Sequence, residues 1–209
     1  DGDPKTISSF VDTPTNGGED TGIGGEVTGT YCTWNSFKMG TSDVSMSQGN
    51  LYWRTTSNGP DHCVYGTMAP KTGKWYWEIE IQGNSALVGI ANQYANQDGG
   101  PAQSHNWGYY SNGQKWLDGT GTSYGDAYVI GDRIGVAWDR DNLTLQFYRN
   151  GTAQGQLTSI SGLDDSEDYF PMAGDSGGGA QSICIANFGQ REFTHPAPSG
   201  YKCLCTQNL

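Results

Sequence analysis

Positive charge is the scarcest feature of this sequence. Its 209 residues hold 11 Lys and Arg against 22 Asp and Glu, which gives a formal net charge of -11. Contacts from Lys and Arg to phosphates supply most of the non-specific affinity for nucleic acids, so this composition argues against binding to DNA or RNA. It also argues against attraction to anionic membrane surfaces, and an acidic surface of this kind chiefly promotes solubility.

Long apolar stretches and helical stripes are also missing. No segment has the length and apolar character of a membrane span or a secretion signal, so we expect no membrane insertion. No stretch of ten or more residues carries the periodicity of an amphipathic helix. Because the sequence begins at Asp1 without Met, we expect a processed product or the ordered portion of a longer chain.

Cysteines are few, and their spacing fits no zinc site. The five are Cys32, Cys63, Cys184, Cys203 and Cys205, with no CxxC pair and no His at zinc-finger spacing. An odd count, with two of the five only two residues apart, argues against a disulfide framework. We therefore expect reduced, partly buried thiols and no cofactor.

Aromatic residues and glycine are abundant by contrast. The sequence holds 7 Trp, 12 Tyr, 6 Phe and 32 Gly. Aromatic side chains bury large areas on half-buried strands, and glycine supplies the turns with positive φ that short strands need. The composition predicts a single all-β domain. Residues 1–30 are turn-rich with few apolar residues, so we expect an irregular N-terminal arm there and the folded domain over 31–209.

Alternating apolar residues mark the strands. Residues 74–81 place Trp75, Trp77, Ile79 and Ile81 on one face, with Tyr76, Glu78 and Glu80 on the other. Residues 134–138 and 143–148 alternate likewise, and the turn between them predicts a hairpin. Shorter candidates are 87–91, 107–110 and 183–188, and further turns with positive φ are expected at Asn112-Gly113 and Asn150-Gly151. The pattern predicts a two-sheet antiparallel sandwich.

The same pattern predicts the core. Its expected members are Trp75, Trp77, Ile134, Val136, Trp138, Leu145 and Phe147. Gly135 is expected to let a Trp of the facing sheet approach closely, because it has no side chain.

These segments, taken in order, resemble the SPRY domain family. The resemblance is carried by KWYWEI at 74–79, VGIA at 88–91, WGY at 107–109, GDRIGVAWD at 131–139, LQFYRNG at 145–151 and YFPMA at 169–173. It covers about residues 50 to 190. It implies a concanavalin-like sandwich without catalysis, whose loops at one edge bind protein partners.

The flanking segments resemble those of SPRY-like domains in structural proteins of tailed phages. The resemblance is carried by 10–35 before the domain and by 187–202 after it. It implies a non-catalytic binding or assembly module of a virion, on a tail or fibre. The expected partners are other virion proteins and a host-surface protein or neutral glycan. A cellular protein-interaction adaptor is an alternative.

Glu78 and Glu80 are the paired carboxylates that an enzyme could use. They lie on one strand face with Cβ atoms roughly 7 Å apart, and retaining glycosidases hold two carboxyl groups about 5 to 5.5 Å apart. A glycan-cleaving enzyme is therefore a second alternative. We favour a solvated strand face and expect no enzyme, since only the analogy of folds supports catalysis.

Two acidic patches, 139–142 and 164–168, have the oxygen ligands that calcium prefers. Neither has the spacing of an EF-hand, and Asp and Asn are common in turns, so we expect no metal.

Recognition by a sandwich falls to its loops, and the longest polar ones expected here are 92–106 and 111–126. Their exposed-looking aromatic and amide residues are Tyr94, His105, Asn106, Trp116 and Tyr124. Tyr and Trp supply large contact areas at low entropy cost, and amides supply hydrogen bonds. Alternatively, Trp116 and Tyr124 fold inward as core caps. If binding does not need Tyr94 and Tyr124, the contact surface is expected in the loop 164–168.

Overall fold

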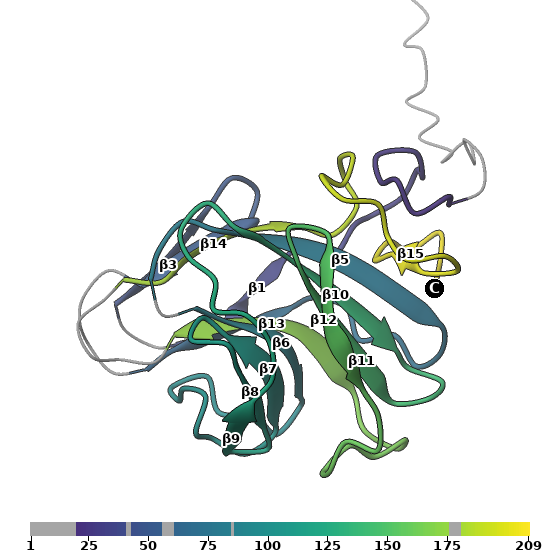
Figure 1. Ribbon diagram of the computed structural model, residues 1–209. Helices are drawn as coiled ribbons and strands as arrows, with labels where there is room; N and C mark the ends of the chain where they lie inside the picture. The colour runs from purple at the N-terminus through teal and green to yellow at the C-terminus, as the bar shows by residue number, and fades with distance from the viewer. Residues whose placement is uncertain (1–19, 41–42, 56–60, 85, 176–180) are drawn as a thin grey trace, which may run out of the picture.

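The computed structural model describes residues 20–40, 43–55, 61–84, 86–175 and 181–209. Within these ranges every regular element is a β-strand, and no helix is long and apolar enough to cross a membrane. The strands form two antiparallel sheets that pack face to face (Figure 1). The expected all-β sandwich is confirmed.

The first sheet has seven strands. In spatial order they are β1 (Trp34–Met39), β4 (Cys63–Gly66), β13 (Tyr169–Asp175), β6 (Ala86–Asn92), β7 (Asn106–Tyr110), β8 (Gln114–Leu117) and β9 (Thr120–Ser123). The second sheet has eight. They are β12 (Thr152–Leu157), β11 (Thr144–Arg149), β10 (Arg133–Asp139), β5 (Lys74–Ile81), β14 (Ile183–Asn187), β3 (Tyr52–Thr55) and β2 (Val44–Ser47), with the short β15 (Lys202–Cys203) parallel to β5.

The core lies between the sheets, as alternation predicts. All seven expected members are buried: Trp75, Trp77, Ile134, Val136, Trp138, Leu145 and Phe147. Residues that alternate with them along β5 and β10 face the other side of the second sheet, because successive side chains on a strand point in opposite directions. Each large aromatic member of this cluster buries a large apolar area, which favours the folded state.

The expected hairpin joins β10 to β11, and Asp132 fixes its open end. The Asp132 carboxylate accepts hydrogen bonds from Val129 N (2.9 Å), Arg149 Nε (2.9 Å) and Asn150 Nδ2 (2.7 Å). Burial by itself would raise the pKa of Asp132, but these hydrogen bonds outweigh burial and lower it. Asn150 and Gly151 both have positive φ, at 48° and 78°, as the turn composition predicts.

The role expected for Gly135 is wrong. A Cβ at Gly135 would lie 2.3 Å from the hydroxyl of Tyr76, on the neighbouring strand β5, rather than against a Trp of the facing sheet. Gly135 therefore makes room for Tyr76 on the outer face of the second sheet.

That outer face is covered, not solvated, which corrects the expectation for Glu78. Residues 188–205, which we call the C-terminal cover, pack over it, and Glu78 is only 1% exposed. The Glu78 carboxylate accepts hydrogen bonds from the backbone N–H groups of Thr194 and His195, both at 2.8 Å. The ring of Phe193 meets Tyr76 edge-on, with centroids 5.0 Å apart.

Residues 20–31 lie beside the C-terminal cover (Figure 1, purple and yellow). Asp20 accepts hydrogen bonds from Cys203 N at 2.8 Å and Asn208 Nδ2 at 2.7 Å, and Val27 is buried against the same cluster. Residues 1–19 are outside the described ranges. A domain boundary at residue 30 therefore stays a prediction.

The five cysteines are free, as expected, and all are buried. Burial raises the pKa of Cys32 to about 11 and that of Cys184 to about 12, because the thiolate loses its hydration. At neutral pH these thiols stay protonated and unreactive.

Candidate functional site

The loop between β6 and β7, residues 93–105, folds back against the first sheet. Gln97 O accepts a hydrogen bond from Cys63 N at 2.8 Å, and Ala95 is only 5% exposed. These contacts fix the loop against the sheet. Several of its side chains are exposed, and Tyr94, at 65%, is the large aromatic one among them.

Neighbouring groups hold Tyr94 in place. Its backbone N–H donates to Asn92 Oδ1 at 3.0 Å, and its ring lies 5.9 Å from the ring of His105. His105 is half-buried with φ at 70°, and its N–H donates to Asp118 Oδ1 at 2.7 Å. The exposed tyrosine ring is therefore pre-positioned, which reduces the entropy lost when it binds.

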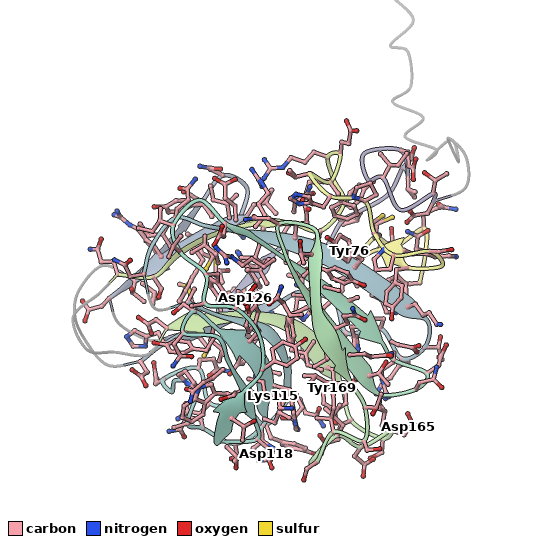
Figure 2. All side chains as sticks on the ribbon, viewed as in Figure 1. Tyr76, Lys115, Asp118, Asp126, Asp165 and Tyr169 are labelled. Atoms are coloured by element: carbon pink, nitrogen blue, oxygen red, sulfur yellow. The ribbon has the colours of Figure 1, made fainter. Side chains whose placement is uncertain are left out.

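A second loop, 158–168, lies at the same end of the sandwich. Arg140, 1% exposed, anchors it by hydrogen bonds to Asp165 Oδ1 (2.7 Å), Asp165 O (2.6 Å) and Glu167 O (3.2 Å). The Arg140 guanidinium also lies 5.4 Å from the ring centroid of Tyr169. Figure 2 shows Asp118 and Asp165 toward the lower end of the molecule, with Tyr76 well above them.

The two loops contact each other directly. Asp168 N donates to Gln93 Oε1 at 2.9 Å, and Asn92 Nδ2 donates to the carboxylate of Glu167. Lys71 forms an ion pair with Asp168. We call the surface formed by Tyr94, His105 and residues 164–168 the loop-end surface. It joins an exposed aromatic ring to polar and acidic groups on a fixed backbone.

The structure separates the five residues predicted from sequence. Tyr94 and His105 lie together, but Asn106 belongs to β7 and is only 2% exposed, so its expected exposure is wrong. Trp116 is half-buried on the outer face of the first sheet, against the cluster that contains Tyr65 and Leu87. The roles of these residues in binding stay predictions.

Tyr124 closes the gap between the sheets and does not join Tyr94. Its ring packs edge-on against Tyr109 at 5.3 Å and Phe147 at 5.9 Å, and its hydroxyl donates to Gly155 O. Burial raises the pKa of Tyr124. Tyr124 therefore follows the alternative prediction, in which it folds inward as a core cap. Its ring fills the edge of the core while its hydroxyl keeps a hydrogen-bond partner.

The segment 111–126, expected as a loop, contains the hairpin β8–β9. Gly121 pairs with Trp116 across that hairpin, and a Cβ at Gly121 would lie 2.7 Å from the indole. The polar, glycine-rich composition hid these strands, because glycine here makes room for a large neighbour.

No group of three or more His, Cys, Asp or Glu side chains that could hold a metal ion occurs in the described ranges. In the acidic patch 139–142, the Asp139 carboxylate already accepts hydrogen bonds from the backbone and side chain of Asn142, at 3.1 and 3.0 Å. It also lies 3.3 Å from Lys74 Nζ. These contacts are those of a capped turn.

The fold and the site together define a class: a two-sheet antiparallel sandwich whose candidate site is a surface of loops at one end. A sequence model of the SPRY domain matches residues 74–191. The chain belongs to the SPRY domain family, as its motifs predicted.

The relatives are much longer proteins. The chain is 29% identical to Ran-binding protein 10 of Danio rerio over 165 residues, which cover 73% of this chain and 26% of that protein. It is 30% identical to Ran-binding protein 9 of Mus musculus, covering 73% of this chain and 24% of the relative. The chain thus spans about a quarter of these relatives' length.

A solved structure shows the same fold. The SPRY domain of human HERC1 superimposes with a TM-score of 0.56 at 18% sequence identity, and the match covers 73% of this chain and 97% of that domain. At this identity the similarity is one of fold alone.

Proposed function

We propose that this chain is a non-catalytic module that binds a protein partner through the loop-end surface. The observation that carries the proposal is Tyr94: a large ring, 65% exposed, on a loop that is fixed to the sheet. Exposed tyrosines on fixed backbones are typical contact residues. Membership of the SPRY family and the names of the Ran-binding relatives support a protein as the partner.

The structure gives little support to the glycan-cleaving alternative. Both oxygens of Glu78 are occupied by backbone N–H groups of the C-terminal cover, while Glu80 forms an ion pair with Arg133. A general acid or nucleophile needs access to its substrate, and Glu78 has none.

Replacing Tyr94 by alanine is expected to weaken partner binding about tenfold or more, because the variant loses a central aromatic contact. Partners are captured on the immobilised chain from the cells or particles that contain it, identified by mass spectrometry, purified and titrated against the variants. Val129→Ala, at a valine that is 63% exposed and lies on the loop before β10, is the matched control. If Tyr94→Ala and Val129→Ala bound the partner with equal affinity and unchanged thermal stability, the contact surface would have to lie elsewhere.

We further propose that the module belongs to a virion, on a tail or fibre. The support is the resemblance of the segments 10–35 and 187–202 to those of phage structural proteins. Antibodies against the chain should label intact purified particles, and the chain should sediment with them. Its recovery only from the soluble fraction of cells would favour the cellular adaptor.

A further inference from the structure

Strand β1 carries a large bulge on the outer edge of the first sheet. Trp34 pairs with Gly66 and Met39 pairs with Val64, so five steps along β1 match only two along β4. The three extra residues, 36–38, are pushed out of the ladder. Bulges on edge strands commonly re-aim a side chain.

The bulge displays Phe37 to solvent. The Phe37 side chain is 94% exposed, and its backbone N–H donates to Asn35 Oδ1 at 2.9 Å, which fixes the turn. A phenylalanine at this exposure contributes almost nothing to the core. Its position on a locally fixed turn leaves the whole ring available to a partner.

A small pocket lies beside the bulge. Its volume is about 80 Å³, and aromatic groups of Tyr65 on β4 and Phe170 on β13 line it together with Asn35 and Gln93. A dry cavity of about 150 Å³ holds a benzene molecule. This pocket has about half that volume, which suits a branched aliphatic side chain better than an aromatic ring.

Lys38 also lines the pocket and gives it a charge. Among the described residues no carboxylate lies within ion-pair distance of Lys38, whereas Lys71 and Lys74 are paired with Asp168 and Asp139. On a chain with a net charge of -11, an unpaired ammonium is one of few places where an acidic group is attracted.

We propose that the Phe37 bulge and this pocket bind an extended peptide segment of a partner protein. The pocket takes a Val, Leu or Ile side chain, Lys38 pairs with an adjacent Asp or Glu, and Phe37 packs on the peptide from outside. The proposal rests on the proposed function and extends it, because Asn92 and Gln93 line the pocket and lead directly to Tyr94.

The test is a selection of random twelve-residue peptides, displayed on a carrier, on the immobilised full chain. The expected outcome is enrichment of an aliphatic residue directly beside Asp or Glu. The affinity of an enriched peptide, measured by fluorescence anisotropy, should fall about fivefold in Phe37→Ala and about tenfold in Lys38→Glu. Both positions are exposed, so thermal stability should not change.

Two matched variants separate local contacts from general effects. Val129→Ala removes an exposed apolar side chain on another loop. Lys202→Glu changes the net charge by the same amount as Lys38→Glu, at an exposed site on β15. Both should bind the peptide like the original chain. An equal loss in Lys202→Glu and Lys38→Glu would overturn the role of Lys38.

Other outcomes also overturn this inference while leaving the proposed function testable. Enrichment of basic peptides whose binding depends on Tyr94 and not on Phe37 would place recognition on the loop-end surface alone. The selection could also enrich no peptide while the chain still captures a folded partner through Tyr94. That result would exclude peptide binding at the pocket and leave the proposed function as a protein-binding module intact.

Discussion

Replacing Trp138 by alanine lowers the free energy of unfolding by about 3 to 5 kcal/mol. Trp138 is 1% exposed in β10, at the centre of the second sheet, and its ring meets Tyr169 of the facing sheet edge-on at 5.6 Å. The substitution removes this contact and leaves a cavity that a closely packed sandwich does not fill. Urea unfolding followed by far-UV circular dichroism measures the loss.

Val129→Ala serves as the control, because a substitution at an exposed site normally changes stability by less than about 0.5 kcal/mol. A loss of under about 1 kcal/mol for Trp138→Ala would mean that the two sheets repack around the vacancy.

Replacing Glu78 by alanine releases the C-terminal cover and costs about 2 to 4 kcal/mol. The variant loses two charge-assisted hydrogen bonds, each contributing about 1.5 to 3 kcal/mol, although the N–H groups of Thr194 and His195 partly recover water. Hydrogen exchange should show faster exchange of backbone amides over 188–205, with slow exchange retained in β10 and β11.

Glu80→Ala is the matched control, two residues along the same strand face. Glu80 forms a partly exposed ion pair with Arg133, and such pairs contribute about 1 kcal/mol or less. If Glu78→Ala left the protection of the C-terminal cover intact, the cover would be held by Phe193 and its apolar neighbours instead.

The sequence alone predicts which residues of each strand face the core. It does not predict what covers the opposite face of the strand. Alternation placed Trp75 and Trp77 correctly, because a pleated strand repeats every two residues. The same rule assigned Glu78 to solvent, although a segment more than a hundred residues later covers it. Local periodicity carries no information on which distant segment packs over a sheet.

Only part of the candidate site could be predicted, because the rest depends on which strands pair. Tyr94 follows a clear strand and precedes a polar loop, so its exposure could be expected. Asn106 is just as polar but is drawn into β7, where its amide bonds to Gly100 O at 3.4 Å. Phe37 gave no signal, because the bulge that exposes it depends on pairing with β4.

The hydrogen bond from the Asn208 amide to Asp20 has a consequence for the order of folding. The two residues are 188 positions apart in the sequence, so the intervening chain must be largely folded before they meet at a small entropic cost. This contact is therefore expected to form late, after the two sheets have packed against each other.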